Sequence, residues 1–153
     1  MALKGAPRLR RTAILTAILG IALLVAGCAQ VSFFPRTQSA GGGPILMGHI
    51  TGKLILDSGC LWLESGSQRD LLIWGSSYGL SSRNWDVEVT RNASVVGVVG
   101  REITVTGGEF TRDSSDPPVD AWIESQIGQK IPTACRLGTY FLVEGVIPST
   151  PAP

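Results

Sequence analysis

The sequence predicts a mainly β domain, a small barrel with one short helix, that follows an amino-terminal targeting segment and a flexible spacer. Three observations lead to this fold class. Short runs of branched and aromatic residues recur between turn signals, glycines lie within and after these runs, and one segment has the apolar spacing of a helix. The domain is expected over 44–147, about 100 residues, which is enough for one hydrophobic core.

The strand-like segments differ in how they are expected to be buried. Val87 and Val89 alternate with charged or polar residues, which is typical of a strand with one face in water. The unbroken apolar run at 71–74 suits a strand that is buried on both sides. Segments 50–56 and 60–64 flank a turn signal and are expected to form a hairpin. The strand-like segments are 50–56, 60–64, 71–74, 86–90, 95–99, 103–106 and 140–146.

One segment, 116–127, breaks the β pattern. It begins with a capping aspartate and prolines, and its apolar residues share the spacing of one helix face. These residues are Val119, Trp122, Ile123 and Ile127. We expect a short helix that ends near Gly128 and covers an open end of the barrel.

Short strands with glycine bends and one short helix resemble an OB-like small β-barrel. A β-sandwich is the alternative, because the strand pattern does not separate the two. The phrases at 59–63, 71–74 and 99–108 are similar to ones that recur in uncharacterised small β domains of bacterial surface proteins. This resemblance concerns structural motifs and implies no activity.

The amino terminus has the charge order of a signal peptide. Residues 1–11 carry four positive charges and no negative charge, and no charged residue occurs in 12–26. The basic end is retained in the cytoplasm because lysine and arginine cross hydrocarbon at a high cost, whereas the apolar run enters it readily. The sequence therefore predicts export.

Residues 24–28 read Leu-Val-Ala-Gly-Cys and resemble the lipobox of bacterial lipoprotein precursors, with Val25 at the position that is usually leucine. The resemblance implies cleavage after Gly27, loss of 1–27, and a diacylglyceryl group on the sulfur of Cys28. Several acyl chains anchor a protein stably, whereas a single chain is marginal. The alternative is an uncleaved transmembrane anchor, which needs about 20 apolar residues. Both alternatives place the rest of the chain at the outer face of a cell membrane.

Two segments are expected to lie outside the folded domain. Residues 28–43 are rich in glycine and polar residues and are expected to form a flexible tether. Phe33 and Phe34 are unusual in such a tether, and they either dip into the lipid interface or pack on the domain. The proline-rich tail, 148–153, is expected to stay disordered.

The charge of the chain is unevenly distributed. The whole sequence carries a formal net charge of +1, but four of its 13 Lys and Arg precede the apolar run, so the part from Cys28 onward carries about −3. A mildly acidic domain lacks the clustered basic face that nucleic acid requires. We therefore expect no nucleic-acid partner.

Cys60 and Cys135 remain once Cys28 carries lipid. An even pair in an oxidising compartment is most simply a disulfide, and two separate buried thiols are the alternative. A metal site is not expected, since His49 is the single histidine and no Cys-x-x-Cys spacing occurs.

The sequence contains no recognisable catalytic signature. His49 lies at the start of the first strand and is expected to be a bystander, and no nucleophile motif or phosphate-binding loop is present. The candidate binding surface is aromatic: Trp74, Tyr78, Arg83 and Trp85 lie in or beside a polar segment that we expect to be a loop. The alternative places Trp74 in the core and Trp85 over the barrel rim.

The sequence thus predicts a non-catalytic, lipid-anchored extracytoplasmic lipoprotein without cofactors, whose β domain binds a protein or a cell-envelope ligand such as a glycan. The alternatives are a structural accessory subunit of a membrane complex and, less favoured, a small envelope hydrolase.

Overall fold

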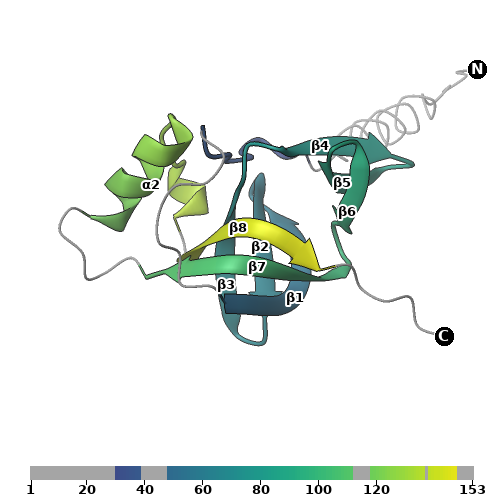
Figure 1. Ribbon diagram of the computed structural model, residues 1–153, viewed down its shortest axis with the longest axis horizontal. Helices are drawn as coiled ribbons and strands as arrows, with labels where there is room; N and C mark the ends of the chain where they lie inside the picture. Colours follow the sequence, from purple (N-terminus) through teal and green to yellow (C-terminus); the bar gives the residue numbers. More distant parts are fainter. Residues whose placement is uncertain (1–29, 39–47, 112–117, 137, 148–153) are drawn as a thin grey trace, which may run out of the picture.

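The computed structural model describes residues 30–38, 48–111, 118–136 and 138–147. Within these ranges most residues belong to strands, which form a closed barrel and a separate three-stranded sheet (Figure 1). The elements are β1 (Gly48–Asp57), β2 (Cys60–Ser65), β3 (Gln68–Trp74), β4 (Tyr78–Arg83), β5 (Asp86–Arg91), β6 (Ser94–Val98), β7 (Glu102–Phe110), α2 (Val119–Ile127), the 3-10 turn η2 (Thr133–Cys135) and β8 (Thr139–Ile147).

The barrel has the strand order β1-β2-β3-β8-β7, and β7 pairs back onto β1. The pairing of β3 with β8 is parallel, and the other four pairings are antiparallel. A five-stranded barrel with this kind of crossover is OB-like. The predicted fold class is confirmed. Because the sheet closes on itself, the domain is the predicted barrel and not the alternative sandwich.

The hairpin expected between 50–56 and 60–64 is confirmed, because β1 pairs with β2 from Lys53↔Glu64 to Asp57↔Cys60. Its two-residue turn places Ser58 at φ 52° and Gly59 at φ 79°. Positive φ at both central residues is the geometry of the turn whose twist matches a β-hairpin.

The barrel wall at β2, β3 and β8 is buried on both faces. On β3, Leu72 and Trp74 point into the barrel and Leu71 and Ile73 point outward, and each of the four is 0% exposed. This arrangement confirms the expectation that the unbroken run at 71–74 is buried on both sides, because successive side chains of a strand alternate between faces.

Helix α2 covers the outer face of this wall. Val119, Ile123 and Ile127 of α2 pack into one cluster with outward residues of β2, β3 and β8, and the helix ends at Gly128 in the left-handed conformation. The helix and its end were therefore predicted correctly, but it begins at Val119 with Pro118 at the N-cap and no side-chain cap, and the expected capping aspartate, Asp116, lies outside the described residues. The expectation that the helix covers an open end of the barrel is wrong. The reason is that β2, β3 and β8 place a continuous set of apolar side chains on the outer face of the barrel, and these side chains need a cover.

The predicted disulfide joins the barrel to the segment that follows α2. Cys60 of β2 and Cys135 of η2 form a disulfide across 75 residues of sequence. Closing a loop of this length stabilises the fold by about 4 kcal/mol on the chain-entropy model. The bond fixes the segment after α2 to the outer face of the barrel.

Residues 30–38 pack against the barrel, which differs from the flexible tether expected over 28–43. The backbone N–H groups of Ser32 and Phe33 donate to the carbonyl of Gly59 at 3.0 Å, and the carbonyl of Pro35 accepts from Trp74 N–H at 2.9 Å. Farther along, Gln38 N–H donates to the carbonyl of Gln126 in α2 at 3.0 Å. This segment links the β1–β2 turn, the end of β3 and the helix.

The alternatives left open for the two phenylalanines are decided in favour of packing on the domain. Phe33 is 5% exposed among the residues beneath α2, and the ring of Phe34 stacks on Trp74 at 5.8 Å between centroids. The folded domain therefore begins earlier than the boundary at 44 that the sequence predicted. Residues 1–29, 39–47 and 148–153 lie outside the described residues.

The segment between β3 and β5, which was expected to be a polar loop, instead contains strand β4. Strands β4, β5 and β6 form a second sheet, and Val89 of β5 is buried in the inner cluster of the barrel. One face of this sheet therefore packs on the barrel, and Figure 1 shows the sheet on the side opposite α2.

If residues 30–38 are part of the fold, Phe33→Ala removes a buried ring and lowers the free energy of unfolding by about 3 kcal/mol. Denaturant unfolding followed by circular dichroism measures the change. The control is Val95→Ala at a side chain that is 49% exposed, for which a change within about 0.5 kcal/mol is expected. Equal stability of the wild-type and Phe33→Ala proteins would contradict the packed arrangement.

Candidate functional site

The β4–β5 hairpin forms an arm with a two-residue tip. The strands pair from Tyr78↔Arg91 to Arg83↔Asp86, and Ser81 Oγ donates to Glu88 Oε2 at 2.9 Å on one face of the arm. At the tip, Asn84 has φ 51° and Trp85 has φ 72°. This turn geometry requires positive φ at both central residues and favours Asn-Gly.

Trp85 occupies the position at which glycine is favoured. A non-glycine residue in the left-handed region costs about 1–2 kcal/mol, and the indole offsets none of this cost by packing, since it is 91% exposed. Residues held in strained backbone conformations cluster at functional sites. Its conformation and its exposure together make Trp85 the strongest candidate for a contact residue.

Two of the four predicted surface residues are part of the core. Trp74 is 0% exposed and Tyr78 is 2% exposed, and their rings lie 5.2 Å apart between centroids. The prediction that they belong to a binding surface is wrong, because Trp74 lies on the inner face of β3 and Tyr78 packs against it. The alternative prediction had two parts. Its first part, that Trp74 is a core residue, is correct, and its second part, that Trp85 covers the barrel rim, is wrong.

Tyr78 is also electrostatically distinctive. Burial raises the pKa of its hydroxyl, and the nearby Arg91 guanidinium partly opposes this effect. The Arg91 guanidinium carbon lies 5.2 Å from the centre of the Tyr78 ring, which is a cation–π distance. This contact fixes the base of the arm.

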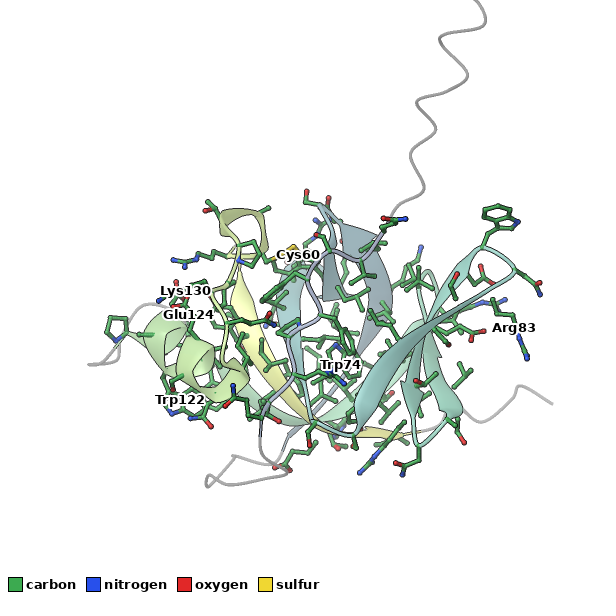
Figure 2. All side chains as sticks on the ribbon, turned by 90° about the horizontal axis from the view of Figure 1, so that it is seen from above. Cys60, Trp74, Arg83, Trp122, Glu124 and Lys130 are labelled. Carbon is green, nitrogen blue, oxygen red and sulfur yellow. A yellow bond between two sulfur atoms is a disulfide. The ribbon has the colours of Figure 1, made fainter. Side chains whose placement is uncertain are left out.

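Arg83 adjoins the tip and is exposed. Figure 2 shows its side chain extending away from the domain beside the β4–β5 turn. Of the predicted surface, the structure thus places Arg83 and Trp85 together at the tip, two residues apart. The sequence signal for this tip was Asn84 directly before the strand-like run at 86–90, since asparagine is favoured at the first position of a two-residue hairpin turn.

The largest ionic cluster among the described residues is centred on Glu124 of α2. Its carboxylate, 9% exposed, accepts from Lys130 Nζ at 2.6 Å, from Arg136 Nη2 at 2.8 Å and from the backbone N–H of Ile131 at 3.1 Å. The hydrogen bond from Lys130, supported by the other two donors, lowers the pKa of Glu124. The neighbouring Asp120 accepts from Tyr140 Oη at 2.6 Å. Glu124 thus joins α2 to the segment that precedes β8, and Asp120 joins the first turn of the helix to β8 itself.

Asp70 is a buried carboxylate on β3. It is 0% exposed, and its Oδ1 accepts from Gln68 Nε2 at 3.0 Å and from Thr139 Oγ1. Its Oδ2 has no hydrogen-bond partner among the described residues. His49 is exposed on β1, where it faces Thr106 in the pairing of β1 with β7.

A hollow of about 330 Å³ lies between residues 34–38 and the end of α2. Its charged lining residue is Arg36, whose Nη1 donates to the carbonyl of Tyr78 at 3.1 Å. This guanidinium therefore fixes the packed segment to the start of β4. The hollow is a weaker candidate than the tip.

The sequence matches no protein-family model, and no curated protein and no solved structure matches it significantly. Over the described residues, no three or more His, Cys, Asp or Glu side chains are grouped so as to hold a metal ion. In the same ranges, no helix has the length and apolar character needed to cross a membrane. Cys28, the predicted lipid attachment site, lies outside the described residues.

Relief of strain at the tip is measurable. Trp85→Gly removes the left-handed penalty at the cost of some chain entropy, and it is expected to raise the free energy of unfolding by about 0.5 kcal/mol. Ala93→Gly in the β5–β6 turn, where φ is 65°, is the matched control and should give a similar gain in urea unfolding. A clear loss of stability in Trp85→Gly would show that the indole supports the fold.

Acidification is expected to weaken the Glu124 cluster. Because the pKa of Glu124 is lower in the folded state than its ordinary value of 4.5, the ionised carboxylate stabilises the fold above that pH, and this contribution is lost as the pH falls through the folded-state pKa. Denaturation midpoints measured from neutral to acidic pH should fall less steeply in Glu124→Gln than in the wild type. Parallel pH profiles would mean that the cluster contributes nothing to stability.

Proposed function

We propose that this chain is an exported lipoprotein whose β domain is held at the outer face of a membrane by lipid on Cys28. The support is the order of a basic segment, an uncharged apolar run and the Leu-Val-Ala-Gly-Cys sequence at 24–28. A disulfide between Cys60 and Cys135 suits an oxidising compartment outside the cytoplasm.

The β domain acts as a non-catalytic binding module for a protein or another component of the cell envelope. The observation that carries this proposal is Trp85, a 91% exposed indole in a strained turn at the end of an arm. An aromatic ring that combines an apolar body with a polar N–H is a common anchor in recognition.

The rest of the domain supports binding at the tip over binding on the barrel wall. In OB-folds the outer face of the second and third strands commonly binds the ligand. Here the corresponding face carries Trp62 and Ile73, which are buried beneath α2. The arm is therefore the better-placed surface.

The anchor is tested by intact-mass analysis of the protein extracted from the membranes of its native host. We expect residues 1–27 to be absent and the mass of the remaining chain to include acyl groups, which are lost in Cys28→Ala. A protein that retains residues 1–27 and carries no acyl group would overturn the anchoring proposal.

Contact at the tip is tested by photo-crosslinking in intact cells. A photoreactive phenylalanine analogue at position 85 should form an adduct with an envelope component, whereas the same analogue at position 93, in the neighbouring turn of the same sheet, should not. If position 85 forms no adduct, the arm is not the contact surface.

A further inference from the structure

We infer that the tip of the β4–β5 arm contacts the headgroup region of the membrane that holds the Cys28 lipid, with the Trp85 indole inserted among the headgroups. This inference rests on the proposed function, since it uses the lipid anchor to place the domain at the membrane. It assigns a ligand of stated chemistry, a phospholipid surface, to the exposed tryptophan.

The distance between the anchor and the folded domain is short. Ser32 N–H is bonded to the carbonyl of Gly59 in the β1–β2 turn at 3.0 Å, and Ser32 follows Cys28 by four residues. Four residues of fully extended chain span at most about 14 Å. Because residues 30–38 are packed on the barrel, the lipid holds the domain close to the bilayer, and the surface around the β1–β2 turn faces the headgroups.

The arm lies on the same side of the domain as this attachment. In Figure 2 the β4–β5 turn, Cys60 and the beginning of the segment 30–38 all lie toward the upper edge of the domain, whereas α2 lies at the left and Trp122 at the lower left. A bilayer that meets the attachment point is therefore within reach of the tip.

The chemistry of the tip suits a membrane interface. Tryptophan is enriched at the headgroup level, because its ring is apolar and its N–H can still meet a polar partner. Arg83 is exposed beside it and can pair with a lipid phosphate while its methylenes cover the apolar boundary. The acidic charge of the domain gives little attraction to an anionic leaflet, so the contact depends chiefly on the indole.

A membrane fits the tip better than a protein partner does. The other large apolar side chains that are exposed in the described ranges are Leu80, Val95 and Ile147, and each is about half exposed or less. None of the three is a residue of the tip, so Trp85 is not the centre of a broad apolar patch. A stable protein interface buries about 800 Å² on each partner, whereas one ring on a narrow turn can enter a fluid interface without a matching surface.

The experiment uses the mature protein purified from its native host and reconstituted into vesicles of phosphatidylethanolamine and phosphatidylglycerol. The acyl chains of these lipids carry bromine, which quenches tryptophan emission on close approach. We expect quenching of the emission component that comes from Trp85, and we expect this quenching to be lost in Trp85→Gly. The variants Trp122→Phe and Ala93→Gly should retain the quenching. Trp122 lies on α2, and position 93 lies in the β5–β6 turn, so neither change affects the tip.

Each possible result of the quenching experiment either supports or overturns insertion of the Trp85 indole. Quenching that requires Trp85 and persists at high salt supports insertion of the indole. Emission from Trp85 that is the same in brominated and ordinary vesicles overturns the inference, even if the protein is lipidated; a crosslink from position 85 to a protein would then identify the occupant. Intact-mass analysis of the same sample tests the anchor separately. If Cys28 carries no lipid, the proposed function fails, and quenching at excess vesicles still decides whether the tip binds lipid.

Discussion

Burial of the β2, β3 and β8 wall on both faces is the constraint on which the rest of the architecture depends. An OB-like barrel with an uncovered wall would expose Trp62, Leu71 and Ile73 to water. Helix α2 covers these residues, the disulfide between Cys60 and Cys135 fixes the segment after the helix, and Phe33 completes the layer. Because this layer covers the wall, the binding surface that we propose lies elsewhere, on the arm of the β4–β5–β6 sheet, on the side of the barrel opposite α2.

The contrast between the two exposed turns of that sheet sharpens the case for Trp85. Asn92-Ala93 and Asn84-Trp85 adopt the same positive-φ geometry, so both turns carry the strain of a side chain at the second position. Alanine adds little surface to solvent, whereas Trp85 holds a large ring, 91% exposed, at a turn position that favours glycine. The requirements of folding explain Asn84 and Asn92, because asparagine tolerates positive φ. They do not explain a tryptophan at the tip.

Much of the fold could be predicted from the sequence, because local patterns determine much of it. The alternation around Val89, the unbroken run at 71–74 and the Gly128 helix end each indicate their element without knowledge of distant contacts. The sequence left the packing of residues 30–38 undecided, since a short segment without periodicity that combines polar residues with Pro35 has the composition of a linker. Its structure comes from backbone hydrogen bonds to Gly59, Trp74 and Gln126, all distant in sequence.

The candidate site was predicted in part for a related reason. Trp74, Tyr78, Arg83 and Trp85 are close in the chain, and composition suggested a single aromatic surface. Strand β4 separates them, because Tyr78 begins the strand against the barrel whereas Arg83 and Trp85 lie at its far end. Separating core aromatics from surface aromatics required the pairing of β4 with β5, and the polar sequence of 79–83 does not indicate a strand.

The parallel pairing of β3 with β8 also governs when the domain can form. Barrel closure waits for the last described strand, because β8 lies between β3 and β7, and the cystine bridge joins positions 75 residues apart. Contacts of such long sequence separation slow folding. Until β8 has been synthesised, β3 and β7 each keep one unpaired edge, and the barrel stays an open sheet that lacks its closing strand.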